Sequence, residues 1–139
     1  FADITVLDLS STPAISLIFG LQHILGVIEN EGVEKRFARH KKNNSMIHEW
    51  AARHDFKHFA PEGNRSVSLS CFHTPPGFDQ SSFIKTLKSK HGFIINGGYG
   101  KIKGITFRIS NMGDETDETI AAMLASLDAA LAETPKAAA

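Results

Sequence analysis

The sequence predicts an α+β fold, in which helices cover a small, mainly antiparallel sheet of about four strands. Stretches with apolar residues at helical spacing open and close the chain, at residues 13–54 and 114–131. Short segments in which apolar and polar residues alternate lie between these stretches and indicate strands. The chain has 139 residues, the usual size of one domain, so we expect one hydrophobic core.

The first two helices are expected to follow each other near the start of the chain, after an extended segment at residues 4–9. Thr12 and Pro13 fit the cap and the first position of a helix that ends at residues 30–32. A second helix is expected from about Val33 to about His54. Its solvated face carries most of the charges. Its buried stripe is expected to comprise Val33, Phe37, Ile47, Trp50 and Ala51.

Strands and helices alternate in the second half of the chain. A helix from about Gln80 to Lys90 and a last helix capped by residues 114–117 complete the α component. Its stripe of Ile120, Met123, Leu124, Leu127 and Leu131 indicates that this last helix packs on the sheet. The strands are expected at residues 56–60, 66–72, 92–96 and 105–110.

Composition narrows the classes of function. Fifteen Lys and Arg balance fifteen Asp and Glu, so net charge does not favour a nucleic acid or an anionic membrane as partner. No apolar run approaches the ~20 residues that span a bilayer. The only cysteine, Cys71, leaves no internal disulfide and favours a reducing compartment, so we expect a cytoplasmic protein. The start at Phe1, without a signal pattern, indicates a piece of a longer protein.

Histidine and cysteine side chains suggest two kinds of chemistry, and neither is favoured. The pair His54 and His58 and the pair Cys71 and His73 both lack a third ligand, so no metal site is expected. Cys71 occupies alternate positions with Leu69 in a strand, which predicts a buried structural thiol rather than a nucleophile. The glycine-rich loop at residues 97–104 lies between strands, so it does not match the phosphate-binding fingerprints that open a helix.

Arg108 is the strongest candidate for a binding residue. It lies at the centre of the strand in GITFRISNMG, residues 104–113, on the polar face between Thr106 and Ser110. The planar guanidinium group can hold a carboxylate through two parallel hydrogen bonds. No general base or nucleophile stands beside it in the sequence, so Arg108 is predicted to recognise an anion.

Three segments resemble one family. GFIINGGYGKIKGITFRISNMG, residues 92–113, resembles the C-terminal domain of class V, fold-type I aminotransferases, and the amphipathic helix after it also fits. SSTPAISLIFGLQHIL with ENEGVEKRFARH, and SCFHTPPGFD, resemble further parts of that domain. The group includes alanine–glyoxylate, serine–pyruvate and phosphoserine aminotransferases, which use pyridoxal 5'-phosphate. The resemblance covers residues 1–139, which implies the small C-terminal domain of an enzyme whose large cofactor-binding domain is absent from this chain.

The resemblance implies roles for particular residues. Arg108 matches the arginine that binds the substrate's α-carboxylate. Ser11 or Thr12 matches a hydroxyl residue that reaches the cofactor phosphate of the neighbouring subunit, which implies a homodimer. Gly97 and Gly98 match a loop near the mouth of the active site. The Schiff-base lysine belongs to the large domain, so no catalytic residue is expected in this chain.

The implied activity moves an amino group from alanine, serine or phosphoserine to a 2-oxo acid such as glyoxylate or pyruvate. The chain alone is expected to be inactive. Ser110 and Asn111 depart from the glycine and histidine that are usual in the family, which leaves the subgroup open. Two alternatives remain: another pyridoxal-phosphate reaction of class V, such as that of a lyase or desulfurase, and a non-catalytic, stand-alone anion-binding domain.

Overall fold

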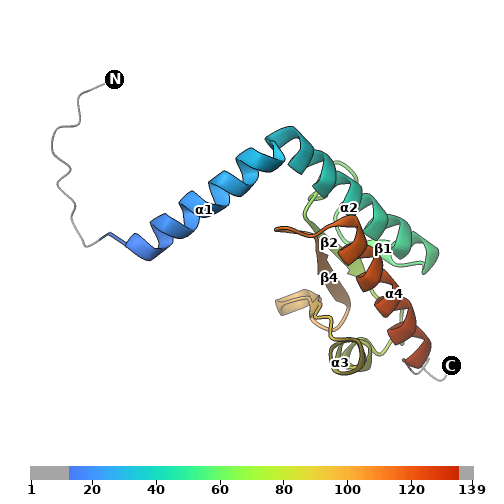
Figure 1. The fold of residues 1–139 in the computed structure, drawn as a ribbon. Coiled ribbons are helices and arrows are strands. Elements are labelled where there is room, and N and C mark those ends of the chain that lie inside the picture. Colours follow the sequence, from blue (N-terminus) through green and yellow to red (C-terminus); the bar gives the residue numbers. More distant parts are fainter. Residues whose placement is uncertain (1–12, 135–139) are drawn as a thin grey trace, which may run out of the picture. The chain divides into compact units, whose positions relative to one another are not determined.

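The structure, a computed structural model, describes residues 13–134 in two compact units, residues 13–36 and 37–134 (Figure 1). The extended segment expected near the start, with Ser11 and Thr12, lies outside the described residues. No described helix is both long and apolar enough to cross a membrane. Because the two units are not placed relative to each other, each is described by itself.

The first unit contains helix α1 (Ile15–Glu31) and the first turn of helix α2 (Val33–Arg53). Ala14 is the residue before α1 and makes no side-chain cap bond, so the expectation that Pro13 is the first residue of the helix is wrong. Gly32 separates the two helices with φ of +87°, a conformation that glycine adopts without strain. The expected stripe on α2 is wrong at Val33 and Phe37, which are exposed.

The second unit is built on a four-stranded antiparallel sheet, which confirms the predicted fold class. The two central strands pair over five residues, with Phe72 opposite Phe107 and Cys71 opposite Arg108. The two edge strands are shorter than predicted, and the last of them begins where the expected strand ended. In spatial order the strands are β1 (Lys57–His58), β2 (Leu69–His73), β4 (Thr106–Ser110) and β3 (Asn96–Gly97).

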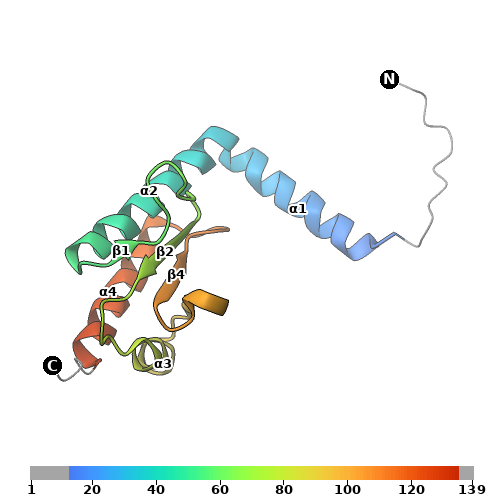
Figure 2. The same cartoon turned by 180° about the vertical axis from the view of Figure 1, so that it is seen from behind.

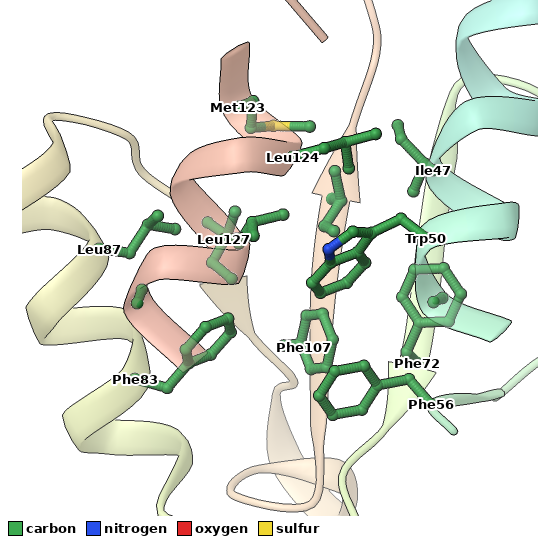
Figure 3. Packing of buried hydrophobic residues seen from close by; sticks show 14 of the residues in the cluster. Ile47, Trp50, Phe56, Phe72, Phe83, Leu87, Phe107, Met123, Leu124 and Leu127 are labelled. Atoms are coloured by element: carbon green, nitrogen blue, oxygen red, sulfur yellow. The ribbon is translucent and has the colours of Figure 1, made fainter. Parts of the chain in front are cut away.

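One face of the sheet forms the hydrophobic core with α2, α3 (Gln80–His91) and α4 (Asp117–Glu133) (Figure 3). Phe107 lies at its centre, with ring centroids 4.9 Å from Phe56, 5.6 Å from Phe72 and 6.0 Å from Phe83. The helices contribute Ile47, Trp50, Ala51, Phe83, Leu87, Ile120, Met123, Leu124, Leu127 and Ala130. The part of the α2 stripe from Ile47 on is therefore confirmed.

Polar contacts hold α4 in place. Thr116 caps its start in a capping box with Thr119, within the segment where the sequence predicts the cap. Trp50 Nε1 donates to Asp128 Oδ1 at 2.7 Å, and His54 Nε2 lies 2.7 Å from the same oxygen. These bonds fix α4 against α2, so that both helices cover the same face of the sheet.

The opposite face of the sheet is only partly covered. Seen from behind, in Figure 2, the short 3-10 helix η1 (Gly100–Ile102) lies in front of the sheet, on the side away from α4. The central strands alternate between the two faces: Phe72 and Phe107 are fully buried, whereas Cys71 and Arg108 are only partly buried. This second face contains the site described next.

Candidate functional site

Arg108 lies in the middle of the open face of the sheet. Its register partners are Cys71 on β2 and Asn96 on β3, so a strand supports it on each side. Because side chains alternate along a strand, Arg108 and the buried Phe107 point in opposite directions. The core therefore fixes the backbone that presents the arginine.

The guanidinium group of Arg108 is fixed at one edge and open at the other. Its Nε donates a hydrogen bond to the carbonyl oxygen of Gly97 at 3.2 Å. Its Cζ lies 4.5 Å from the centroid of the Tyr99 ring, a cation–π contact. The two terminal nitrogens make no hydrogen bond with any described residue. Such a pair of donors matches the two oxygens of a carboxylate.

The glycine loop approaches β4 so closely that Gly98 admits no side chain. Its N–H donates to the carbonyl oxygen of Thr106 at 2.8 Å. A Cβ at this position would lie 2.2 Å from Thr106 Oγ1 and 2.5 Å from the oxygen of Ile102. This contact places the carbonyl of Gly97 and the ring of Tyr99 against Arg108.

Two further polar groups hold this loop on the sheet. Gln80, the first residue of α3, donates its buried amide to the Thr106 carbonyl oxygen. The Thr106 hydroxyl donates to the carbonyl oxygen of Ile102 at 2.9 Å. Thr106 is thus on the same face as Arg108, as predicted, but it is fully buried beneath the loop and supports it.

Asn111 explains why the strand ends where it does. The side chain is fully buried, and its Nδ2 donates to the carbonyl oxygens of His40 at 3.0 Å and Val67 at 3.1 Å. Asn43 Nδ2 and Arg39 Nη1 both donate to the Glu115 carbonyl oxygen, at 2.8 and 2.6 Å. The segment after Arg108 is therefore attached to α2 by side-chain-to-backbone bonds.

Cys71 is not the core thiol that the sequence predicts. It lies on the face of Arg108 and is partly buried, and it is Ser70 and Phe72 that point into the core. The prediction failed because the alternation was assigned to the wrong face, and a shift of one residue exchanges the two faces of a strand. Burial raises the pKa of the Cys71 thiol, although Thr106 and the charge of Arg108 act in the opposite direction. A reactive thiolate is therefore not favoured.

The structure brings Arg108, Gly97 and Gly98 together, whereas Ser11 and Thr12 lie outside the residues it describes. No group of three or more His, Cys, Asp or Glu side chains suited to a metal occurs among residues 13–134. Sequence reasoning missed the contact of Tyr99 with Arg108. The signal available was that the only tyrosine of the chain stands in the glycine loop before the strand.

The chain is similar to aminotransferases of known sequence and structure. An uncharacterised aminotransferase of Methanocaldococcus jannaschii is 30% identical over 122 residues, which cover 88% of this chain and 32% of that protein. A serine–glyoxylate aminotransferase of Methylorubrum extorquens is 26% identical over 122 residues, 86% of this chain and 30% of its own length. Models of known protein families gave no match.

A solved structure, the pyridoxamine–pyruvate aminotransferase of Mesorhizobium loti, superposes with a TM-score of 0.83 at 25% identity. The match covers 91% of this chain and 33% of that one. The chain therefore has the fold of an aminotransferase domain. Together, these relatives confirm the resemblance to the C-terminal domain of class V aminotransferases. The chain spans about a third of the length of the relatives that it matches.

Proposed function

We propose that residues 1–139 form the small C-terminal domain of a pyridoxal-phosphate-dependent aminotransferase, in which Arg108 binds the α-carboxylate of the amino acid. The observation that carries the proposal is the state of the guanidinium group. One edge is bonded to Gly97, one face contacts Tyr99, and both terminal nitrogens remain open to a ligand. The aminotransferases among its relatives support the reaction class.

In this role Arg108 orients the substrate and transfers no proton. Two parallel hydrogen bonds to the carboxylate fix both the position and the rotation of the amino acid. Such positioning lowers the entropic cost of reaching the reactive geometry. The bond to Gly97 and the stacking of Tyr99 hold the guanidinium plane before the substrate arrives, so less side-chain freedom is lost on binding.

Pyridoxal phosphate, when bound, supplies the electron sink for the reaction. The open face around Arg108 fits the carboxylate of the substrate, and the described residues of that face do not by themselves make a phosphate site. Ser11 or Thr12 is proposed to reach the cofactor phosphate of the neighbouring subunit, which requires a homodimer. A cytoplasmic location is part of the proposal, and it is based on the single cysteine.

The proposed donors are alanine, serine or phosphoserine, and the proposed acceptors are 2-oxo acids such as glyoxylate or pyruvate. The names of relatives support this class, because they include serine–glyoxylate and ureidoglycine–glyoxylate aminotransferases. Asn111 is buried and bonded to backbone carbonyls, so its departure from the usual histidine acts on the loop and not directly on the substrate.

The test uses the protein expressed from its complete gene. Arg108→Ala is expected to raise the KM for the amino acid about 100-fold, because two charge-assisted hydrogen bonds are lost. The visible absorption of bound cofactor should stay unchanged. Arg53→Ala, which removes an exposed arginine at the end of α2, is the matched control and should leave the KM as it is. An unchanged KM in Arg108→Ala would contradict the proposed role.

A further inference from the structure

A second concave site lies at the edge of the sheet, beside β1. A cavity of ≈ 510 Å³ opens there, and four of the residues that line it are basic: His48, Lys57, His58 and Arg65. Lys57 pairs with His73, so its side chain points to the opposite face of the sheet and is not counted among the charges of the cavity. No carboxylate is among the residues that line it. We call this site the basic cavity. The rest of its wall is apolar or backbone, from Ala52, Phe56, Phe59, Ala60 and Pro61.

The basic cavity is separate from the face of Arg108. His58 pairs with Phe72, whose side chain is in the core, so His58 points to the helix-covered side of the sheet. His48 comes from α2 on that same side, and its Nε2 lies 3.0 Å from Ser70 Oγ. A ligand at this cavity therefore cannot be the substrate carboxylate proposed for Arg108.

The polar groups of the basic cavity are close together and only partly used. The rings of His48 and His58 are 4.3 Å apart, centroid to centroid, and inclined at 75°. Arg65 Nε donates to the carbonyl oxygen of Ala60 at 3.3 Å, which holds the loop and leaves the terminal nitrogens without a partner among the described residues. The ring nitrogens of His58 also have none there.

The positive charges of the basic cavity are not compensated by a carboxylate among its lining residues. Burial and the charge of Arg65 lower the pKa of His48. Burial, then His48 and Arg65, lower the pKa of His58. Asp55, next in sequence to the lining residue Phe56, lies 3.8 Å from Lys57 in a pair that is almost fully exposed. An anion in the cavity would remove this repulsion, and each imidazole would then bind its proton more tightly.

We propose that the basic cavity binds a phosphate-class oxyanion carried on a small organic body. Imidazolium and guanidinium groups are donors that bind such anions through charge-assisted hydrogen bonds. A volume of ≈ 510 Å³ exceeds what one inorganic ion fills and lies in the range of small-molecule sites. Apolar surface for the remainder of the ligand comes from exposed lining residues such as Ala52 and Pro61.

The test is a titration of the 139-residue chain, followed by the NMR signals of its histidine rings. The probes are sulfate, inorganic phosphate and phenyl phosphate, with chloride at equal ionic strength as reference. We expect saturable shifts of His48 and His58 but not of His23. Phenyl phosphate should bind more tightly than inorganic phosphate. Sulfate, which keeps its charge, should bind more tightly at about pH 5.5 than at about pH 7.5, because protonated imidazoles donate two hydrogen bonds.

Three variants test whether the anion binds at the basic cavity and not elsewhere on the chain. Arg65→Gln, in an exposed loop, should weaken binding of phenyl phosphate about tenfold, since one charge-assisted contact is lost. Lys88→Gln removes one charge from α3 and should have no effect. Arg108→Gln should also have no effect, so failure here is distinguishable from failure of the proposed function. Shifts that chloride reproduces, or an affinity for phenyl phosphate that is unchanged in Arg65→Gln, would overturn the proposal. Equal affinity for inorganic phosphate and phenyl phosphate would contradict the proposal that the ligand carries an organic body.

Discussion

Phe107 and Arg108 are neighbours in the chain, yet their side chains lie on opposite faces of the sheet and have different roles. Phe107 is fully buried, and its ring contacts four other aromatic rings beneath the helices. Arg108 points to the open face, where one edge of its guanidinium group remains available. A strand that alternates in this way separates stability from binding within two consecutive residues.

The comparison shows why the arginine can be well positioned without being buried. Its backbone is fixed by the core on the opposite face and by pairing with two strands. Its side chain is fixed by Gly97 and Tyr99, which belong to the loop folded over the open face. Mutations on the two faces should therefore have separable effects, and the following predictions test this in order of expected size.

The largest effect is expected for Phe107→Ala. The substitution leaves a cavity among the aromatic rings, and the free energy of unfolding should fall by about 3–5 kcal/mol. Phe59→Ala makes the same deletion at a side chain that is 44% exposed, and should cost about 1 kcal/mol or less. Urea unfolding of both variants measures the difference. Similar losses for the two would show that a ring in the core contributes no more to stability than a partly exposed one.

An intermediate effect is expected for Gly98→Ala, which acts on the loop between the two faces. The new Cβ would lie 2.5 Å from the backbone oxygen of Ile102, so the loop must move. The free energy of unfolding should fall by about 1–3 kcal/mol, and the bond from Arg108 Nε to Gly97 should be lost. Urea unfolding and the NMR signal of the Arg108 Nε–H group report these two changes.

Gly26→Ala is the matched control for that substitution. Gly26 lies inside α1, and nothing stands within 4 Å of its added Cβ. This change should leave stability unchanged or raise it by up to about 1 kcal/mol, because alanine favours the helix. If Gly98→Ala were equally harmless, the close packing of the glycine loop would not be what positions Arg108.

The fold class could be predicted from the sequence because its signals are local. Alternation identified β4, and helical spacing identified α4 with its stripe of Ile120, Leu124 and Leu127. Prediction failed where the outcome depends on distant residues. Which face of β2 is buried depends on the helices that cover it, and Cys71 was therefore assigned to the wrong side.

The candidate site was predictable to a similar degree. Arg108 could be identified because an arginine at the centre of an apolar strand has a recognisable chemistry. Its partners could not, since Gly97, Tyr99 and Gln80 reach it or its loop through tertiary contacts that have no fixed spacing in the sequence. The basic cavity joins α2, β1 and a loop, and no single segment contains its signal.

The smallest effect is expected for Tyr99, which contacts Arg108 from an exposed position. A cation–π contact at such a site is worth about 0.5–1 kcal/mol, so Tyr99→Ala in the complete enzyme should raise the KM for the amino acid about 2–5-fold. Tyr99→Phe keeps the ring and should restore the KM, whereas the free energy of unfolding should be unchanged in both. If Tyr99→Phe were as impaired as Tyr99→Ala, the hydroxyl rather than the ring face would be the functional part of this residue. That outcome would place a hydrogen-bond donor beside Arg108 on the open face, and the division between a stabilising and a binding face would then extend to the loop itself.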